Sequence, residues 1–531
     1  MTEAIATAEA EEQPEATRPR RRWARLAILV TVFVCAACGL VYELALVALG
    51  SYLIGDAIGQ ASIVLSVMVF AMGLGALVAK PLQRWPATSF AAIEVALALL
   101  GGLSVLGLYA AFAWLDLYIP ALVTTALVLG LLIGAEIPLL MALLQRIRQQ
   151  DAGHAVADMF AADYVGALLG GLAFPFLLLP LFGQVRGALL VGAVNALAGL
   201  GLVLVVFRRD LARRATVILT VLGVVSLAVL GGAYAFANQF EITARQALYQ
   251  DPITHAVRSP YQEIVITESL SLSGRRDTRL FLNGDLQFSS VDEYRYHEAL
   301  VHPAMAGDRD EVLVLGGGDG LAVREILRYD DVRRITLVDL DPEVIRLARE
   351  HPRLVDLNQG ALNDPRVHVV TADAFTWLRD AEPGRYDVIV ADLPDPDSTA
   401  TAKLYSVEFY ALTTRVLADG GRMVVQAGSP YFAPRSYWCI EATLRAAGYA
   451  TTPYHVNVPT FGDWGFHLAA LGDDAPVLRL PDNAGRLRFL TTESLRAAGV
   501  FPADRSRIEV PPSTLMNPRI VQYAVDEWRD Y

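Results

Sequence analysis

Cysteine and basic residues are both scarce in this sequence. Only three cysteines occur among 531 residues: Cys35 and Cys38 lie in one apolar run, and Cys439 lies far downstream. This number excludes a disulfide framework and does not identify the cellular compartment. Acidic residues outnumber Lys and Arg by 56 to 44, which gives a net charge of −12. That balance argues against a nucleic-acid partner and is compatible with a cationic ligand.

A convincing signal peptide is also missing from the N-terminus. Residues 1–22 are polar, with acids first and a cluster of arginines from Arg18 to Arg22. We interpret them as a disordered tail. The apolar run that follows is too long for a signal peptide and lacks a clear cleavage site.

Long hydrophobic runs are abundant, and they are confined to one half of the chain. The hydrophobic fraction is 54% and the mean hydropathy is +0.39, with the excess in residues 24–238. About 20 apolar residues suffice to cross a bilayer. We therefore predict a transmembrane helical domain over 23–238, with seven spans near 25–51, 61–79, 88–113, 118–142, 159–182, 186–207 and 215–238. Many small residues within these runs predict close helix packing: Gly73, Gly75, Gly101, Gly102, Gly166, Gly170 and Gly171.

Basic residues in the connecting loops predict an orientation. Arginines precede the first run, and Lys or Arg follow the second, fourth and sixth runs, whereas the other loops carry almost none. The positive-inside rule then places the N-terminus in the cytoplasm. Seven crossings would leave the C-terminal half on the outer side.

Four acids lie within or at the edge of these runs: Glu43, Glu94, Glu136 and Asp163. A carboxylate at membrane depth is costly and usually faces the interior of the bundle. Two interpretations stay open, a site or path for a cation such as a polyamine, and hydrogen bonding between helices.

The second half has ordinary globular composition. We predict a linker and entry helix over 239–257, a small β-strand subdomain with a helix over 258–305, an α/β domain over 306–475, and a C-terminal tail with short helices over 476–531. Within the α/β domain, short apolar runs each end in an acid or a glycine-rich turn. This pattern predicts parallel strands that deliver carboxylates to one edge of a Rossmann-like sheet.

The glycine-rich turn reads Gly316-x-Gly318-Asp319-Gly320. A dinucleotide fingerprint requires a sixth-position glycine, where this chain has Leu321, so nicotinamide chemistry is disfavoured. The spacing fits an adenosyl-sulfonium ligand instead. Asp339 ends the next strand, where an acid commonly holds a ribose diol. Asp373 and Ala374 follow the third strand, near the expected adenine edge, and Asp373 also suits a helix N-cap.

Three acids in six residues follow a buried strand: Asp392, Asp395 and Asp397. Two prolines stiffen the loop that carries them. Mutual repulsion should raise at least one pKa, which suits a proton acceptor. Such a cluster also suits a cationic amine, although an oxygen-rich magnesium or calcium site competes with that interpretation.

Motifs over residues 258–470 resemble those of the spermidine synthase, or polyamine aminopropyltransferase, family. The matching pieces, in order, are Tyr261-Gln262, Leu282-Asn-Gly-Asp-Leu-Gln287, Asp292-Glu-x-x-Tyr-His-Glu298, His302-Pro303, Gly316-Gly-Gly-Asp-Gly320, Val338-Asp339, Asp373-Ala374, Asp392-x-x-Asp-Pro396, Leu404-Tyr405 and Pro459-Thr460. The apolar N-terminal half resembles the membrane-fused branch of that family.

The resemblance implies a role for each matching residue. Asp392 matches the general base and Asp395 the amine-binding acid, while Gln287 and Tyr296 match the neighbourhood of the active-site gate, where they would also bind the amine. The positions around decarboxylated S-adenosylmethionine are matched by Gln262, His297, Gly316, Gly318, Asp319, Gly320, Asp339, Asp373 and Ala374. Two departures concern the acceptor amine: Phe461 replaces the usual tyrosine after Pro-Thr, and Leu-Pro follows Asp392.

We therefore expect aminopropyl transfer from decarboxylated S-adenosylmethionine to putrescine, which would give spermidine and methylthioadenosine. The alternatives are a methyltransferase on the same scaffold and a membrane polyamine transporter or sensor. We assign no metal and no cofactor, since the nucleoside is a co-substrate, and we expect a homo-oligomer, either dimer or tetramer. The lipid bilayer is the other expected partner. Because decarboxylated S-adenosylmethionine is made in the cytoplasm, we favour a cytoplasmic catalytic domain against the loop-charge count.

Overall fold

The protein consists of two compact units, Met1–Gln250 and Asp251–Tyr531. The computed structural model describes residues 18–54, 57–115, 117–147, 152–249, 251–270, 274 and 276–528. Most of the predicted disordered tail, residues 1–17, lies outside the described residues. The remainder of that tail is helical, because the first helix already begins at Arg18.

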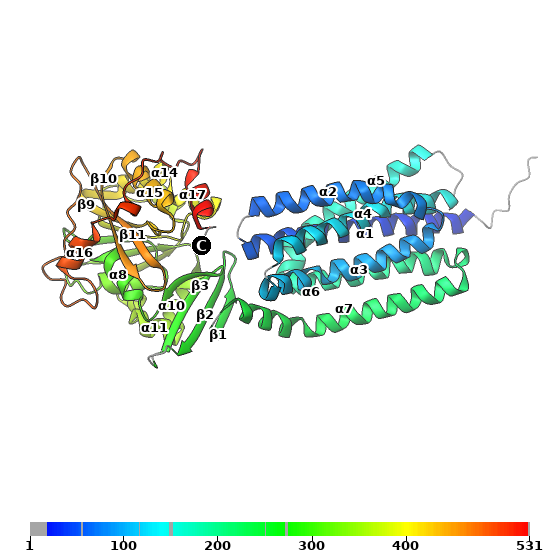
Figure 1. Ribbon diagram of the computed structural model, residues 1–531, viewed down its shortest axis with the longest axis horizontal. Helices are drawn as coiled ribbons and strands as arrows, with labels where there is room; N and C mark the ends of the chain where they lie inside the picture. Colours follow the sequence, from blue (N-terminus) through cyan, green and yellow to red (C-terminus); the bar gives the residue numbers. More distant parts are fainter. Residues whose placement is uncertain are drawn as a thin grey trace, which may run out of the picture. The chain divides into compact units, whose positions relative to one another are not determined.

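The first unit is a bundle of long apolar helices (Figure 1). Among the described residues, six continuous helical stretches are long and apolar enough to cross a membrane, by length and composition. The helices are α1 (Arg18–Ile54), α2 (Ala57–Leu82), α3 (Pro86–Ala110), α4 (Tyr118–Ile147), α5 (Ala152–Ala173), α6 (Leu179–Gly201) and α7 (Arg213–Leu248).

The fifth stretch contains two of the seven predicted runs. It extends over 51 residues, Val156–Val206. The helix is interrupted at Gly183, whose φ of 71° and ψ of −179° lie outside the α-helical region. This break falls between the predicted runs 159–182 and 186–207. At about 1.5 Å per residue, 51 residues are far longer than one crossing needs.

Glycines let the helices approach closely, as predicted for most of them. A Cβ atom on Gly75 would lie 2.0 Å from the Leu131 carbonyl oxygen, and one on Gly166 would lie 2.2 Å from that of Phe33. Such contacts exclude any larger residue. Gly73 is different, since a Cβ atom there would meet nothing within 4 Å.

The second unit begins with a four-stranded antiparallel sheet. Its order is β1-β2-β3-β4, with β1 at Ile253–Arg258, β2 at Glu263–Leu270, β3 at Arg276–Leu282 and β4 at Asp285–Ser289. The Asn283-Gly284 turn predicted from sequence joins β3 to β4, and both residues have positive φ, 53° and 97°. The predicted linker and entry helix, residues 239–257, include the end of α7, which continues to Leu248, and most of β1, which begins at Ile253.

A seven-stranded mixed sheet forms the core of the second unit. Its order is β10-β11-β9-β8-β5-β6-β7, and β9, β8, β5, β6 and β7 are mutually parallel, while β11 is antiparallel to both of its neighbours. The strands are β5 (Glu311–Gly316), β6 (Arg334–Asp339), β7 (Val367–Thr371), β8 (Tyr386–Asp392), β9 (Leu417–Gln426), β10 (Tyr449–Val458) and β11 (Gly462–Leu471).

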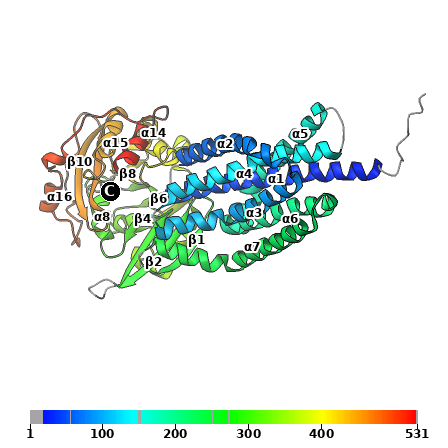
Figure 2. The same cartoon turned by 45° about the vertical axis from the view of Figure 1, so that its right-hand side comes forward.

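Helices cover both faces of this sheet (Figure 2). Alternate residues of β5 enter different cores: Val312 and Val314 pack on one side, and Leu313 and Leu315 on the other. One face is covered by α8 (Glu293–Val301), α9 (Leu321–Ile326), α10 (Pro342–Glu350) and α16 (Thr492–Ala498). The other is covered by α12 (Ala374–Asp380), α14 (Val407–Val416), α15 (Pro434–Ala446) and α17 (Arg519–Trp528). Because helices bury both faces of the sheet, its parallel strands are apolar along their whole length instead of alternating.

Candidate active site

The glycine-rich turn and the acid-rich loop meet at the carboxyl ends of two neighbouring parallel strands. Gly316, at the end of β5, is in register with Asp392, at the end of β8. The Gly317 N–H donates a hydrogen bond to the Asp392 carbonyl oxygen at 3.0 Å. Gly316 has a φ of 77°, and a Cβ atom there would lie 2.1 Å from the same oxygen. Glycine is therefore required at this turn, which opens directly onto the acid loop.

Asp339 ends β6 beside the same turn. Its carboxylate accepts hydrogen bonds from the N–H groups of Gly318, at 3.0 Å, and Asp341, at 2.9 Å. Burial raises the pKa of Asp339 to about 6, although these two hydrogen bonds act in the opposite direction. Gln262 reaches the site from the small sheet, and its amide donates to the Asp341 carboxylate at 2.9 Å. The predicted nucleoside positions Gly318, Asp339 and Gln262 therefore belong to one polar cluster.

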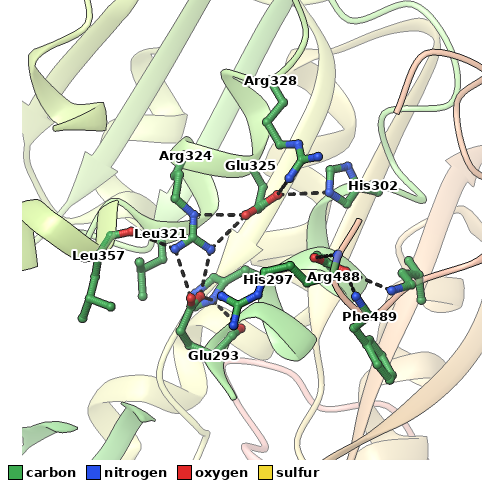
Figure 3. A network of polar contacts seen from close by, with 12 residues as sticks. Glu293, His297, His302, Leu321, Arg324, Glu325, Arg328, Leu357, Arg488 and Phe489 are labelled. Atoms are coloured by element: carbon green, nitrogen blue, oxygen red, sulfur yellow. Dashed lines mark hydrogen bonds and ion pairs between the residues drawn. The ribbon is translucent and has the colours of Figure 1, made fainter. Parts of the chain in front are cut away.

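A buried ion network supports α8 and α9 behind the turn (Figure 3). Arg324 donates two hydrogen bonds to Glu293, at 3.0 and 2.8 Å, and His297 Nδ1 lies 3.1 Å from the same carboxylate. Burial, the largest single effect, lowers the pKa of His297, but the hydrogen bond to Glu293 and the charges of Glu293, Asp319 and Asp392 together exceed it, so the pKa is raised. Fixed in this way, α8 presents His297 and the adjacent Tyr296 to the site.

Asp319 lies at the start of α9, next to this network. Its carboxylate accepts the Leu321 N–H at 2.8 Å. Burial raises the pKa of Asp319 to about 6, with the charge of His297 opposing the rise and that of Asp392 adding to it. Asp319 and Asp392 thus act electrostatically on each other from the two sides of the glycine turn.

The Tyr296 hydroxyl donates a hydrogen bond to Asp392 Oδ1 at 2.6 Å. Burial raises the pKa of Asp392, and the charge of His297 and the Tyr296 hydrogen bond limit that rise. A carboxyl group with a raised pKa is a stronger proton acceptor once ionised. The tyrosine is packed against Phe461 and Phe466, with ring centroids 6.1 and 5.4 Å away. Its orientation toward Asp392 is therefore fixed by packing.

A second acidic group lies further along the loop. Asp395 Oδ1 accepts a hydrogen bond from the Gln426 amide at 3.1 Å. Burial raises the pKa of Asp395 to about 6, and the charge of Asp397 adds to the rise. Asp285, at the start of β4, faces the same two acids. The residue as a whole is exposed, but partial desolvation of its carboxyl group and the charges of Asp397 and Asp395 raise its pKa to about 7.

Asp285 was not singled out as a site residue in the sequence. Its hairpin brings it to an acid loop more than 100 positions away, and no local pattern reports that approach. The same holds for Lys403, whose ammonium group pairs with Asp373 Oδ2 at 2.5 Å. Asp373 also accepts the Thr376 N–H at 2.9 Å as the N-cap of α12, and Ala374 begins that helix.

Gln287 makes a more local contact than the resemblance implied. Its side-chain amide donates to the Asp285 backbone oxygen at 3.2 Å, within its own strand. Its place at the active-site gate stays a prediction. Tyr405, by contrast, is completely buried, and its hydroxyl donates to the backbone oxygens of Leu393 and Pro394, at 3.2 and 3.0 Å. These two hydrogen bonds hold the start of the acid loop in place.

Part of the chain matches a known protein family. Residues 293–478 match the family model described as the spermine/spermidine synthase domain. Together with relatives that are 49% and 60% identical over nearly the whole chain, this match defines the class of the protein as an aminopropyltransferase enzyme.

Relatives over nearly the whole chain identify the family. Polyamine aminopropyltransferase 1 of Streptomyces coelicolor is 60% identical over 510 residues, which cover 96% of each chain. The polyamine aminopropyltransferase of Mycobacterium tuberculosis is 49% identical over 524 residues, 97% of this chain and 98% of that one. The chain belongs to the polyamine aminopropyltransferase family, and the similarity extends through its helical unit.

A solved structure also matches part of the chain. It is a spermidine synthase in complex with the transition-state analogue AdoDATO, 27% identical, which covers 47% of this chain and 85% of that one with a TM-score of 0.44.

Proposed function

We propose that the protein transfers the aminopropyl group of decarboxylated S-adenosylmethionine to putrescine, with Asp392 as the general base. The observation that carries this proposal is the pair of acidic groups at one sheet edge. Asp392, with Tyr296, adjoins the glycine turn, and Asp395 lies further along the same loop. A diamine has two cationic ends, and this arrangement offers a carboxylate to each.

The reaction needs a neutral amine and an activated carbon. An alkyl amine is almost wholly protonated at neutral pH and then has no free lone pair. Asp392 therefore takes a proton from the ammonium group of putrescine. The freed lone pair attacks the propyl carbon bound to the sulfonium. The carbon–sulfur bond then breaks, its electron pair moves to sulfur, and methylthioadenosine leaves. Positioning contributes most of the rate, since the leaving group already activates the carbon.

The nucleoside is held on the other side of Asp392. Asp339 is suited to the ribose hydroxyls, because its two oxygens already face backbone N–H groups of the turn and of α10. Gln262 and His297 complete that side, and Asp373 with Ala374 would border the adenine. Asp395 would hold the remote ammonium of putrescine, and the exposed acids Asp285 and Asp397 would add to the field that attracts it.

Turnover of a panel of amines tests the proposed acceptor. Purified protein with decarboxylated S-adenosylmethionine should give the highest kcat/KM with putrescine among diamines of increasing length. A preference for a monoamine would contradict the role of Asp395, because a monoamine has no second ammonium. A preference for a longer diamine would replace putrescine as the acceptor but retain the reaction.

We also propose that the helical unit resides in a membrane. Among the described residues, its six apolar stretches are each long enough to cross a bilayer. Large apolar side chains such as Phe70, Phe176 and Val205 are 64%, 77% and 80% exposed on the bundle. In water, so much exposed apolar surface would drive aggregation, whereas in lipid it is the expected outer surface.

A further inference from the structure

Three side chains from three helices meet inside the helical unit. Cys35 of α1, Glu94 of α3 and Glu136 of α4 each offer a ligand atom, and these atoms lie within 4.8 Å of one another. The three residues are 2%, 0% and 5% exposed. Among the described residues, this is the group of His, Cys, Asp or Glu side chains that is close enough to hold a metal ion. The helices that carry it pack against one another (Figure 1 and Figure 2).

The two carboxylates have little compensation for their charge. Asn195 of α6 donates a hydrogen bond to Glu94 Oε2 at 2.8 Å. Within the described part of the bundle, neither Glu94 nor Glu136 forms an ion pair with a basic side chain. Removing a carboxylate from water without a partner costs several kcal/mol. Two of them side by side require a positive charge nearby, which a proton or a bound cation must supply.

An unpartnered oxygen atom within this group points to a bound ligand. Among the described residues, Glu94 Oε1 has no hydrogen-bond partner, although Glu94 is completely buried. The Asn195 hydrogen bond engages only the other oxygen, Glu94 Oε2. Each such buried oxygen costs about 1–3 kcal/mol unless something binds it.

The distances fit a small ion. When three atoms lie within 4.8 Å of one another, a single point lies within about 2.8 Å of all of them. Zinc–sulfur and zinc–oxygen bonds are about 2.3 and 2.0–2.2 Å long, so small side-chain rotations close the remaining gap. The ligand types narrow the choice, because a thiolate selects a borderline or soft metal, whereas magnesium and calcium prefer oxygen alone.

We propose that Cys35, Glu94 and Glu136 bind a divalent transition-metal ion such as Zn²⁺. The two positive charges of the ion would balance two of the three negatively charged ligands. The Asn195 amide, which donates to Glu94, would stabilise the remaining negative charge. Because α1, α3 and α4 each contribute a ligand, the site would fasten the bundle together. This site is independent of the acid loop in the second unit and of the proposed reaction.

Cobalt provides the direct test, because Co²⁺ binds zinc sites and a thiolate ligand gives it a charge-transfer band in the near ultraviolet. Full-length protein in detergent, treated with a chelator and titrated with Co²⁺, should develop this band at one equivalent. Zn²⁺ should then remove the band by displacement. Cys35→Ser should abolish the band, and Glu94→Gln and Glu136→Gln should each weaken binding at least tenfold.

Cys38→Ser is the matched control, since Cys38 lies one turn further on the same helix and its thiol donates to the Val191 carbonyl oxygen at 3.8 Å. It should keep the band. A second measurement does not depend on colour: Zn²⁺ should raise the Tm of the wild type and of Cys38→Ser but not that of Cys35→Ser. Absence of the band in the wild type, its survival in Cys35→Ser, or an equal Tm rise in all three proteins would overturn the proposal.

Discussion

Replacing Asp392 with asparagine separates proton removal from every other role of this residue. The Asp392 backbone oxygen, which accepts the Gly317 N–H at 3.0 Å, is unchanged by the substitution. The asparagine side-chain oxygen can still accept the Tyr296 hydrogen bond that Asp392 Oδ1 accepts at 2.6 Å. The glycine turn and α8 should therefore keep their positions, while the carboxylate that we propose as the proton acceptor is lost.

The expected loss follows from that difference. Removing a positioned general base typically costs 10²- to 10⁴-fold in rate, roughly 3–5 kcal/mol of barrier. We expect kcat for Asp392→Asn to fall within this range. Nucleoside affinity should change by no more than roughly twofold, as is usual where no contact is lost. Stopped-time measurement of methylthioadenosine release gives kcat, and calorimetric titration with decarboxylated S-adenosylmethionine gives the affinity.

Asp397→Asn is the matched control, because it removes an exposed acid from the same loop without touching the glycine turn. It should retain most of the wild-type kcat. If Asp392→Asn kept more than a tenth of the wild-type rate, the base would have to be another group. If both variants lost rate equally, the effect would reflect the charge of the loop and not proton transfer.

Four further outcomes are expected. Tyr296→Phe removes a hydrogen bond that holds down the pKa of Asp392, so the pKa should rise and the acid limb of the kcat/KM profile should move to higher pH; an unmoved limb would exclude Asp392 as the titrating base. Asp285→Asn should raise the KM for the amine roughly two- to fivefold with kcat unchanged, since an exposed charge contributes up to about 1 kcal/mol; a fall in kcat alone would contradict this. Phe461→Tyr should change the KM for the amine more than kcat, because Phe461 packs edge-on against Tyr296; an unchanged amine preference would show that the position is idle. A C-terminal tag should resist external protease in intact cells and be cleaved once the cells are opened; cleavage in intact cells would place the catalytic unit outside.

The sheet and its ligand-facing edge were predictable because they depend on short-range patterns. Four apolar runs that end in glycine or acid predict parallel strands, and parallel strands necessarily bring Gly316 and Asp392 to the same edge. The hairpin at Asn283-Gly284 was predictable for a similar reason, since type I′ turns favour those two residues.

Contacts between distant segments were not predictable from these patterns. The Tyr296–Asp392 hydrogen bond joins residues 96 positions apart, and the sequence associated Tyr296 with the gate and the amine but not with Asp392. The approach of Asp285 to the acid loop depends on how the small sheet packs against α10 and α11 (Pro352–Asn358), through side chains such as Val344 and Leu354. Periodicity does not encode that packing.

The ends of two helices differ from the predicted ends for local reasons. The helix α1 begins within the arginine cluster that appeared too polar for regular structure, because arginine itself has high helix propensity. The prediction of a linker and entry helix over 239–257 did not place the end of that helix at Leu248, because a helix can continue past the apolar surface that first stabilises it.

The identity of the group transferred tests the central claim most directly. Purified full-length protein should be incubated with putrescine and either decarboxylated S-adenosylmethionine or S-adenosylmethionine, and the products identified by mass spectrometry. With the decarboxylated donor, spermidine and methylthioadenosine should appear in equal amounts, and the second donor should give no methylated amine. Methylated putrescine with S-adenosylhomocysteine, and no spermidine, would contradict the proposed reaction.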